Sequence, residues 1–306
     1  MSNTVGVSSR ITVPFLLQKK QRGEKITMLT AYDFPSAYLL DQSETDIVLV
    51  GDSLAMTVLG QENTLSVTMD EMIYHTSAVS RACKRALVVG DMPFGSYQGG
   101  MNQAIQNGMR FMKEGRCAAV KLEGGKQRAS VIAAMVEAEI PVMAHVGLTP
   151  QSMHRFGGFK VQGKSIDAAM AIMEDAFAVQ EAGAFAVVLE SIPIAVAAEI
   201  TPRLRIPTIG IGAGVHCDGQ VLVWHDFLGL RENRVPRFVK QYANFYPEML
   251  NSTNQYCHEV REGIFPDEQH GYCMPDLELF LEKVEEKYGN YSACPSHEGK
   301  LQESKV

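Results

Sequence analysis

The chain has 306 residues, of which 46% are hydrophobic and 21% are charged. These proportions are ordinary for a globular protein and exclude a mainly disordered or collagen-like chain. No run of about 18 apolar residues is present, so no membrane-spanning segment is predicted, and the net charge of -7 argues against a nucleic-acid-binding surface. A small anionic substrate stays compatible with this charge, because the local charge at a site matters more than the total.

The cysteines and the N-terminus indicate the compartment. The six cysteines stand at irregular spacings without a C-x-x-C pair, which favours reduced thiols over disulfides or a zinc site. The N-terminus has no apolar stretch of the kind found in secretory signals, so we expect a cytoplasmic protein. Import into an organelle is the weaker alternative, because no acidic residue precedes Glu24.

From Ile26 onward, short apolar runs alternate with longer stretches of helical periodicity. A run that is apolar on both faces is typical of a strand in a parallel sheet covered by helices. Eight strands are predicted in this way, at residues 26–30, 47–50, 87–89, 118–120, 142–144, 186–189, 208–211 and 221–224.

The stretches between these runs carry helix signals. Pro35 stands where a first helical turn would begin, and Thr68 with Glu71 forms a T-x-x-E capping box. Apolar stripes follow at residues 132–136 and 169–177, the second before Gly183. Eight strands in alternation with helices favour an α/β fold of the (β/α)8 TIM barrel type, with a doubly wound open sheet as the alternative.

Two segments lie outside the predicted barrel. Residues 11–17 could close its bottom, and the aromatic segment 238–256 is predicted to be helical and packed. Further on, a helix is predicted at residues 276–288, where one face is apolar, with Gly289 at its end. We therefore divide the chain into a barrel domain, residues 1–265, and a C-terminal extension, residues 266–306, whose tail is expected to be disordered.

Polar residues follow most of the predicted strands. In barrels the catalytic groups stand at the carboxyl ends of the strands. The residues at these ends are Tyr32, Asp33, Asp52, Ser53, Asp91, Lys121, Glu123, His145, Glu190, His225 and Asp226. The alternative is that charges simply begin where burial ends, but the strand starts carry fewer of them.

Asp52 and Asp91 follow consecutive strands. Neighbouring strands lie about 4.8 Å apart, so the two carboxylates can converge on one point. Without a cation they would repel each other, whereas Mg²⁺ takes one or two carboxylates and leaves room for a chelating substrate. The alternative is a pair of carboxylates that cap the strand ends.

Three further strand ends carry titratable groups. Lys121 and Glu123 project from the same side of one strand, where one could bind a substrate carboxylate and the other a metal-bound water; an internal salt bridge is the alternative. His145 taken alone is more often a satisfied core residue. Glu190 follows a buried run, so its partly desolvated carboxyl group suits a general base, although an ordinary strand-end carboxylate fits equally well.

The run G-I-G-A-G at residues 210–214 follows the seventh strand. Val215 stands where the dinucleotide-binding fingerprint requires a third glycine, so that reading is disfavoured. An anion cradle and simple close packing are both left open. For His225 and Asp226, the interpretation is that each orients the other structurally.

Seven ordered motifs together resemble the ketopantoate hydroxymethyltransferase family over about residues 10–265. They are T-A-Y-D (30–33), V-G-D-S (50–53), G-D-M-P-F-G-S-Y (90–97), V-K-L-E-G-G (120–125), A-H-V-G-L-T-P-Q (144–151), I-G-I-G-A-G (209–214) and C-D-G-Q-V-L-V-W-H-D (217–226). The resemblance implies a barrel of the phosphoenolpyruvate mutase/isocitrate lyase type. It also implies transfer of a hydroxymethyl group from 5,10-methylenetetrahydrofolate to 3-methyl-2-oxobutanoate, which gives the pantothenate precursor 2-dehydropantoate.

The resemblance also assigns residues to roles. Asp52 and Asp91 correspond to ligands of Mg²⁺ that lie against the chelated substrate, and Glu123 to a carboxylate that reaches the metal through water. The remaining assignments are the 2-oxo acid contacts Ser53 and Lys121, the active-site histidine His145 and the general base Glu190. The family resemblance further implies a homo-oligomer, typically a decamer, with a 2-oxo acid and a folate as its small-molecule partners.

Two rival functions come from other classes. One is a Mg²⁺-dependent 2-oxo acid C–C lyase of the related barrels, but the K-x-C-G-H loop of those lyases is absent here. The other is a non-catalytic ligand-binding barrel, which the intact Asp52, Asp91, Lys121 and Glu190 disfavour.

Overall fold

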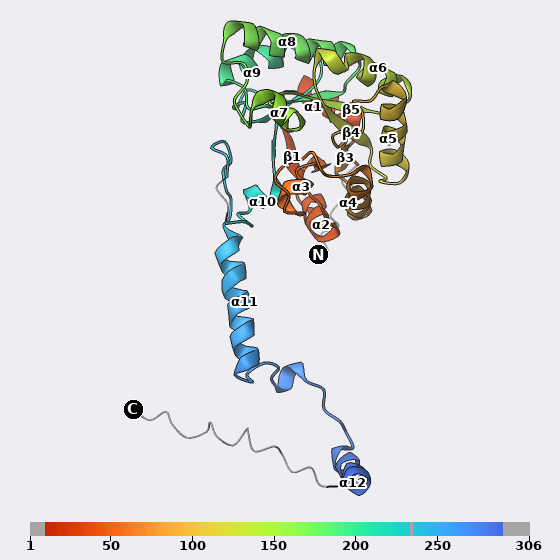
Figure 1. The fold of residues 1–306 in the computed structure, drawn as a ribbon, viewed down its shortest axis with the longest axis vertical. Helices are drawn as coiled ribbons and strands as arrows, with labels where there is room; N and C mark the ends of the chain where they lie inside the picture. Colours follow the sequence, from red (N-terminus) through yellow and green to blue (C-terminus); the bar gives the residue numbers. More distant parts are fainter. Residues whose placement is uncertain (1–9, 233–234, 290–306) are drawn as a thin grey trace, which may run out of the picture. The chain divides into compact units, whose positions relative to one another are not determined.

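The computed structural model describes residues 10–232 and 235–289, and its eight parallel strands close into a barrel in chain order (Figure 1). The strands are β1 Ile26–Thr30, β2 Ile47–Val50, β3 Leu87–Asp91, β4 Ala119–Glu123, β5 Val142–Gly147, β6 Ala186–Glu190, β7 Thr208–Ile211 and β8 Gly219–Leu222. The predicted barrel is thus confirmed, and the open sheet is excluded. Only the eighth strand was misplaced: it lies two residues earlier than predicted, because Trp224 begins the short helix α10 (Trp224–Phe227).

Helices connect most of the strands on the outside of the barrel. They are α2 Phe34–Gln42, α3 Leu54–Thr57, α4 Met69–Ala82, α5 Met101–Lys113, α6 Ala129–Glu137, α7 Met153–Phe156, α8 Ile166–Glu181 and α9 Ile194–Ile200. The predicted capping box of Thr68 and Glu71 is present at the start of α4. Gly183 has φ +93° just after α8, a left-handed conformation that favours glycine.

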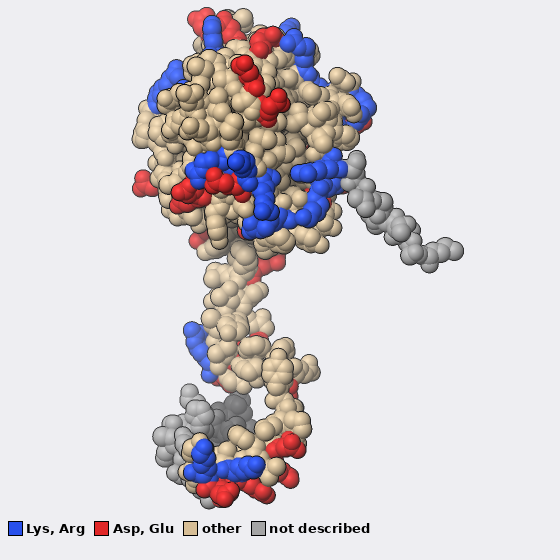
Figure 2. Space-filling model, turned by 90° about the vertical axis from the view of Figure 1, so that its right-hand side faces the viewer, with Lys and Arg blue, Asp and Glu red and all other residues tan. Residues whose placement is uncertain are grey.

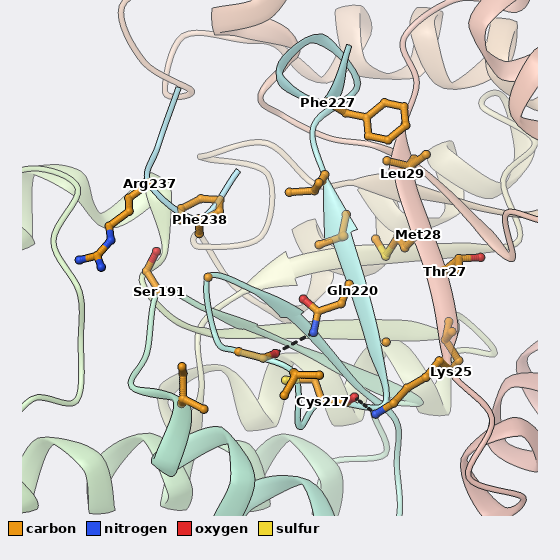
Figure 3. Close-up of a pocket in the computed structure, with 18 of the residues that line it drawn as sticks. Lys25, Thr27, Met28, Leu29, Ser191, Cys217, Gln220, Phe227, Arg237 and Phe238 are labelled. Carbon is orange, nitrogen blue, oxygen red and sulfur yellow. Dashed lines mark hydrogen bonds between the residues drawn. The ribbon is translucent and has the colours of Figure 1, made fainter. Parts of the chain in front are cut away.

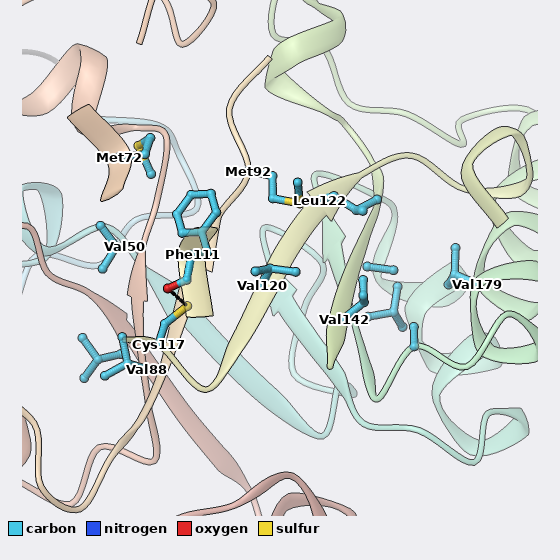
Figure 4. Packing of buried hydrophobic residues seen from close by; sticks show 14 of the residues in the cluster. Val50, Met72, Val88, Met92, Phe111, Cys117, Val120, Leu122, Val142 and Val179 are labelled. Carbon is cyan, nitrogen blue, oxygen red and sulfur yellow. Dashed lines mark hydrogen bonds between the residues drawn. The ribbon is translucent and has the colours of Figure 1, made fainter. Parts of the chain in front are cut away.

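The outward side chains of the strands pack against these helices. Figure 4 shows part of this layer, in which Val88, Val120 and Val142 face residues of the helices. Gly90 is one position where glycine is required, since an added Cβ would lie 2.5 Å from the ring of Phe111. Close packing of α5 on β3 therefore fixes the strand that ends in Asp91.

The bottom of the barrel interior is closed by α1 (Val13–Gln21), as predicted. Leu16 of this helix is fully buried, and Ile11 just before it is 4% exposed. Both pack with inward-facing strand residues such as Ile47 and Phe185 in one apolar cluster. Apolar side chains thus seal the amino ends of the strands.

The helical layer is incomplete beside β8 and β1. The connection from β7 to β8 contains no helix, and α10 after β8 has only four residues. A groove of about 990 Å³ lies along the outward side chains of these strands (Figure 3). Lys25 and Gln220 donate hydrogen bonds across it to the backbone oxygens of Cys217 and Gly214. Within the described part of the chain, this section of the barrel wall therefore stays uncovered.

The chain forms two compact units, Met1–Tyr246 and Pro247–Val306. The boundary expected after residue 265 falls inside the second unit. Its helices are most of α11 (Phe245–Arg261) and α12 (Leu277–Tyr288), so the predicted helix at 276–288 is confirmed within one residue. The expected disordered tail, residues 290–306, lies outside the described residues.

The expectation of a packed helical segment at residues 238–256 was confirmed only in part, because residues 245–256 are helical but none of them is buried. It becomes helical only at Phe245, because the preceding backbone bonds to the end of α10: Tyr242 donates to Phe227 O at 2.9 Å, and Phe245 to Leu228 O at 3.1 Å. No residue of α11 or of α12 is buried within the chain.

On the barrel face seen in Figure 2, Lys and Arg side chains lie beside Asp and Glu side chains rather than apart from them. None of the described helices is both long and apolar enough to cross a bilayer.

Candidate active site

All seven residues assigned by the family resemblance line one cavity of about 370 Å³ at the carboxyl ends of the strands: Asp52, Ser53, Asp91, Lys121, Glu123, His145 and Glu190. Strand register explains this convergence. Asp91 of β3 stands opposite Lys121 of β4, and Glu123 of β4 stands opposite His145 of β5. Since side chains alternate along a strand, residues of the same parity all point into the barrel.

Asp52 and Asp91 are buried side by side. They are 4% and 1% exposed, and the Asp52 backbone N–H donates to Asp91 Oδ2 at 3.1 Å. Burial, followed by the charges of Asp91 and Glu123, raises the pKa of Asp52 well above its usual range. Burial and the charge of Glu123 also raise the pKa of Asp91, although Lys121 opposes the rise. Two buried carboxylates that destabilise each other's charge fit a cation.

Lys121 forms the salt bridge that the sequence left open as an alternative. Its Nζ lies 2.8 Å from both carboxylate oxygens of Asp91 and 4.0 Å from Glu123 Oε1. Burial opposes its charge, but the neighbouring carboxylates outweigh that effect and raise the pKa of Lys121. The ammonium group is therefore retained inside the cavity, where it can also bind an anion.

His145 lies between two carboxylates, so it is not an ordinary core histidine. Its Nδ1 is 3.6 Å from Glu123 Oε1, and its Nε2 is 3.2 Å from Glu190 Oε2. Burial and the charge of Lys121 lower its pKa, but the two carboxylates prevail and bring the pKa to about 9. His145 is therefore an imidazolium at neutral pH. Burial likewise disfavours the charge on Glu123, yet His145 and Lys121 lower the pKa of that carboxyl group.

Gln151 and Tyr97 organise the site, and strand-end reasoning missed both. Gln151 Nε2 donates to Asp52 Oδ2 at 2.9 Å and to Met92 O at 3.0 Å, and its Oε1 accepts from the Tyr97 hydroxyl at 2.6 Å. The backbone N–H of Gln151 donates to Glu123 Oε2, and the backbone N–H of Glu123 donates to the hydroxyl oxygen of Tyr97. Both residues lie in the loops that follow strands, so strand-end positions do not reveal them. Their place within the quoted motifs is the one signal for them in the sequence.

The hydroxyl group of Ser53 lies 2.7 Å from that of Tyr32 at the edge of the cavity. The expectation that His225 and Asp226 orient each other was wrong. Asp226 Oδ1 instead accepts from Arg231 at 2.5 Å, while the His225 ring lies 5.4 Å from the Tyr32 ring. The reason is local: His225 and Asp226 lie side by side in the first turn of α10 and take different neighbours.

The glycine run after β7 serves close packing. Gly212 has φ +65°, and a Cβ there would lie 2.8 Å from the ring of Phe238. A Cβ on Gly214 would lie 2.7 Å from Ile194. These two glycines therefore admit neighbouring apolar side chains, as the close-packing interpretation expects.

The charges of the cavity do not balance. Its lining includes five carboxyl groups and three groups that carry positive charge: Asp52, Asp91, Glu123, Glu190, Asp226, Lys121, His145 and Arg231. With all eight ionised, five negative charges against three positive charges leave two uncompensated, which matches a divalent cation. Within residues 10–232 and 235–289, no three acidic, His or Cys side chains are close enough to ligate one ion together. A cation here would take two protein carboxylates and complete its shell with water or substrate, as Mg²⁺ usually does.

The closed barrel of parallel strands, with a polar cavity at its carboxyl end, defines a protein of the β/α-barrel class. Solved structures share this fold: phosphonopyruvate hydrolase with oxalate and Mg²⁺ has a TM-score of 0.56 at 12% identity, covering 90% of this chain and 99% of its own. 2,3-Dimethylmalate lyase, itself a member of the phosphoenolpyruvate mutase/isocitrate lyase superfamily, has a TM-score of 0.54 at 16% identity, covering 90% of this chain and 95% of its own.

The family model described as ketopantoate hydroxymethyltransferase matches residues 10–268, and the chain belongs to this family. A 3-methyl-2-oxobutanoate hydroxymethyltransferase of Trichlorobacter lovleyi is 57% identical over 263 residues, which cover 86% of this chain and 98% of the relative. The enzyme of the same name from Carboxydothermus hydrogenoformans is 52% identical over 276 residues, covering 90% and 99%. The resemblance seen in the motifs is thereby confirmed.

Proposed function

We propose that this chain is a 3-methyl-2-oxobutanoate hydroxymethyltransferase. It transfers a hydroxymethyl group from 5,10-methylenetetrahydrofolate to 3-methyl-2-oxobutanoate, with water, and gives 2-dehydropantoate and tetrahydrofolate. One observation carries the proposal: in a member of this family, the seven side chains that the motifs assign to the reaction line a single cavity.

The donor set fits Mg²⁺. Asp52 and Asp91 would hold it, and Glu123 stands close by with a buried Oε1 that has no hydrogen-bond partner among the described residues. When bound, the cation supplies positive charge to the oxo and carboxylate oxygens of the substrate. Gln151 keeps Asp52 oriented for this task through its 2.9 Å hydrogen bond.

The remaining side chains act on the substrate itself. Lys121 and Ser53 bind and orient the 2-oxo acid, which fixes the face that it presents. Glu190 removes the proton from C3. Water hydrolyses both C–N bonds of the methylene carbon, so that tetrahydrofolate leaves and the carbon is released as formaldehyde. The enolate carbon forms the new C–C bond to this carbon, whose oxygen takes up a proton to become the hydroxyl group. His145 lies 3.2 Å from Glu190 Oε2 as an imidazolium and therefore positions the base.

Product formation tests this function directly. The purified chain with Mg²⁺, 3-methyl-2-oxobutanoate and 5,10-methylenetetrahydrofolate should form 2-dehydropantoate, detected by NMR. Omission of the folate or chelation of the cation should abolish the product. Absence of 2-dehydropantoate from the complete mixture, at micromolar enzyme, would contradict the proposal.

The protein is also proposed to be a homo-oligomer, for which the family resemblance implies a decamer. A barrel wall is normally covered by helices. The uncovered groove beside β8 and β1 therefore supports an assembly in which a second copy of the chain covers it. The 17 residues of α11, none of them buried, offer such a helix. The cytoplasmic location stays a prediction from the sequence.

Light scattering tests the assembly. Val215 lines the groove and is 72% exposed, so Val215→Glu should leave the chain folded while lowering the molar mass of the assembly. Gln18→Glu on the exposed side of α1 serves as the control. Deletion of residues 273–306 would separately test whether α12 contributes. An unchanged mass for Val215→Glu would show that the groove is not an interface.

A further inference from the structure

The active-site cavity has an outer part that the residues assigned so far do not explain. The lining residues with an assigned role, here called the deep part, include Asp52, Asp91, Glu123, Glu190, Lys121 and His145. The outer part is lined by apolar and aromatic side chains together with a few polar groups: Met56, Thr64, Pro150, Phe159, Asp226, Arg231, Pro236, Phe238 and Val239. A cavity of about 370 Å³ exceeds the needs of a five-carbon oxo acid, since sites of roughly 300–1,000 Å³ hold drug-sized ligands.

Phe238 provides a flat wall in this outer part. Its ring lies over Gly212, where an added Cβ would lie 2.8 Å from it, so the glycine leaves room for the ring. Phe238 is 37% exposed although it lines the cavity (Figure 3 labels it beside the neighbouring groove). Phe159 lines the same outer part and is 52% exposed. Exposed aromatic rings are suited to stacking against a flat heterocycle.

Asp226 and Arg231 place an acceptor next to a donor. The carboxyl group of Asp226, a residue 8% exposed, accepts from Arg231 through Oδ1, and no other hydrogen bond to it is found among the described residues. The guanidinium group has five N–H donors, so Arg231 can keep this ion pair and still donate elsewhere. Thr64 adds a third polar group: it is 3% exposed, lines the cavity, and its hydroxyl has no partner within the described chain.

We propose that this outer part binds the pteridine ring of the folate co-substrate, an inference that rests on the proposed function. The edge of the pteridine presents one carbonyl oxygen beside an N–H and an amino group. Arg231 donates to the carbonyl oxygen, and Asp226 accepts from the N–H and the amino group. The face of the ring stacks on Phe238, and Thr64 offers its hydroxyl to a ring nitrogen.

The same Asp226–Arg231 pair could instead only fasten the segment after α10. A structural role and a folate-binding role differ in one respect. Enolisation of 3-methyl-2-oxobutanoate requires the deep site and the cation but no folate, so exchange of the C3 hydrogen in D₂O reports on the deep site alone. Binding of the folate is reported by its KM in the complete reaction.

Asp226→Asn and Phe238→Ala separate the two roles. Each should raise the KM for 5,10-methylenetetrahydrofolate about 10–100-fold, since a lost bidentate pair or stacking ring weakens binding by that order. C3 exchange should stay within about twofold of the parent, and Phe238→Tyr should restore the KM. The matched control is Arg237→Met, because Arg237 lines the neighbouring groove and not this cavity.

Binding can also be followed without turnover. The chain has one tryptophan, Trp224, which stands two residues before Asp226. The unreactive 5-formyltetrahydrofolate should quench the fluorescence of Trp224 at similar concentrations in the parent and in Arg237→Met. In Asp226→Asn, quenching should require higher concentrations of this folate. Circular dichroism checks that each variant is folded.

The outcomes distinguish the inference from the function on which it rests. If the parent forms 2-dehydropantoate and both variants keep the parental KM, the folate binds elsewhere and only this inference fails. If the variants lose C3 exchange together with turnover, the pair is structural and the inference fails as well. If the parent forms no 2-dehydropantoate, the proposed function itself is wrong, whatever the variants do.

Discussion

The two ends of the barrel interior are built from the same strands but have opposite chemistry. At the amino ends, inward residues such as Leu87, Ala119 and Met143 join Leu16 of α1 in a dry apolar cluster. Further along the same strands the inward residues are titratable: Asp91 stands four positions after Leu87, Lys121 two after Ala119, and His145 two after Met143. One end can therefore stabilise the fold while the other bears groups that are costly to bury.

This division explains why the site can hold so many unbalanced charges. Burial of a charge that lacks a full set of partners destabilises a protein, and at the carboxyl end two negative charges stay uncompensated without a cation. The apolar end, closed by α1, offsets this cost. Variants at the two ends should consequently affect different quantities, and the predictions below test that separation.

The largest effect is expected for Glu190→Gln at the polar end. The amide keeps the shape of the side chain but cannot accept the C3 proton. Loss of a general base typically reduces a rate about 10²–10⁴-fold. Exchange of the C3 hydrogen of 3-methyl-2-oxobutanoate in D₂O, followed by NMR with Mg²⁺ and without folate, should fall by this factor while substrate affinity changes little.

Glu199→Gln on the exposed surface of α9 is the matched control and should exchange at the parental rate. If Glu190→Gln also exchanged at the parental rate, Glu190 would not be the base.

Asp91→Asn should weaken Mg²⁺ binding and also destabilise the fold. Loss of an outer-sphere partner typically costs about 10–100-fold in metal affinity, so removal of a direct ligand should cost at least about 100-fold. The change also leaves the Lys121 ammonium buried without its closest anion, and breaking a buried pair costs about 3–5 kcal/mol. Titration calorimetry and thermal unfolding measure the two effects; parental Mg²⁺ affinity would rule out Asp91 as a ligand.

Leu16→Ala should produce the reverse pattern at the apolar end. Truncation of a fully buried leucine typically lowers the free energy of unfolding by about 2–5 kcal/mol. Because Leu16 lies at the opposite end from the carboxylates, kcat of the folded enzyme should stay at the parental value. Urea unfolding and turnover should be measured side by side, with Gln18→Ala as the exposed control on the same helix. A loss of kcat with unchanged stability would contradict the separation of the two ends.

The sequence predicted the strand-end residues of the polar end better than the loop residues that contact them, for physical reasons. Strand ends are recognisable because a buried apolar run stops there, so Asp52, Asp91, Lys121, Glu123, His145 and Glu190 could all be found. Gln151 and Tyr97 lie in loops without periodicity, and what they contact depends on how those loops fold over the barrel. The role of the glycines was open for the same reason, since the partner of Gly212 is Phe238, distant in sequence.

The C-terminal region shows a second limit. Apolar periodicity correctly predicted α12, because a stripe of apolar residues is a local property. The packed helical segment expected at 238–256 rested instead on its aromatic residues, and such a composition shows neither where a helix begins nor which surface covers it. The uncovered groove beside β8 and β1 could not be predicted either, as it depends on the absence of helices between known strands.

The smallest effect is a pH dependence that originates beside the polar end, at His225 in α10. Burial, followed by the charge of Arg231, lowers the pKa of His225, although Asp226 and Asp33 oppose this. The Tyr32 ring also packs on it, and its buried Nδ1 has no hydrogen-bond partner among the described residues. The neutral imidazole is therefore favoured in the folded state.

The sign follows from proton linkage. A histidine whose pKa is lower in the folded state than in the unfolded chain binds fewer protons when folded. Its stabilising contribution is complete above its unfolded pKa of about 6.5 and is lost as the pH falls through the folded value. His225→Gln cannot titrate, so between about pH 7.5 and about pH 5 its Tm should fall less than that of the parent. Gln18→Ala, which removes no titratable group, should follow the parent, and an equal fall for His225→Gln would show that other groups at this end of the barrel carry the acid sensitivity.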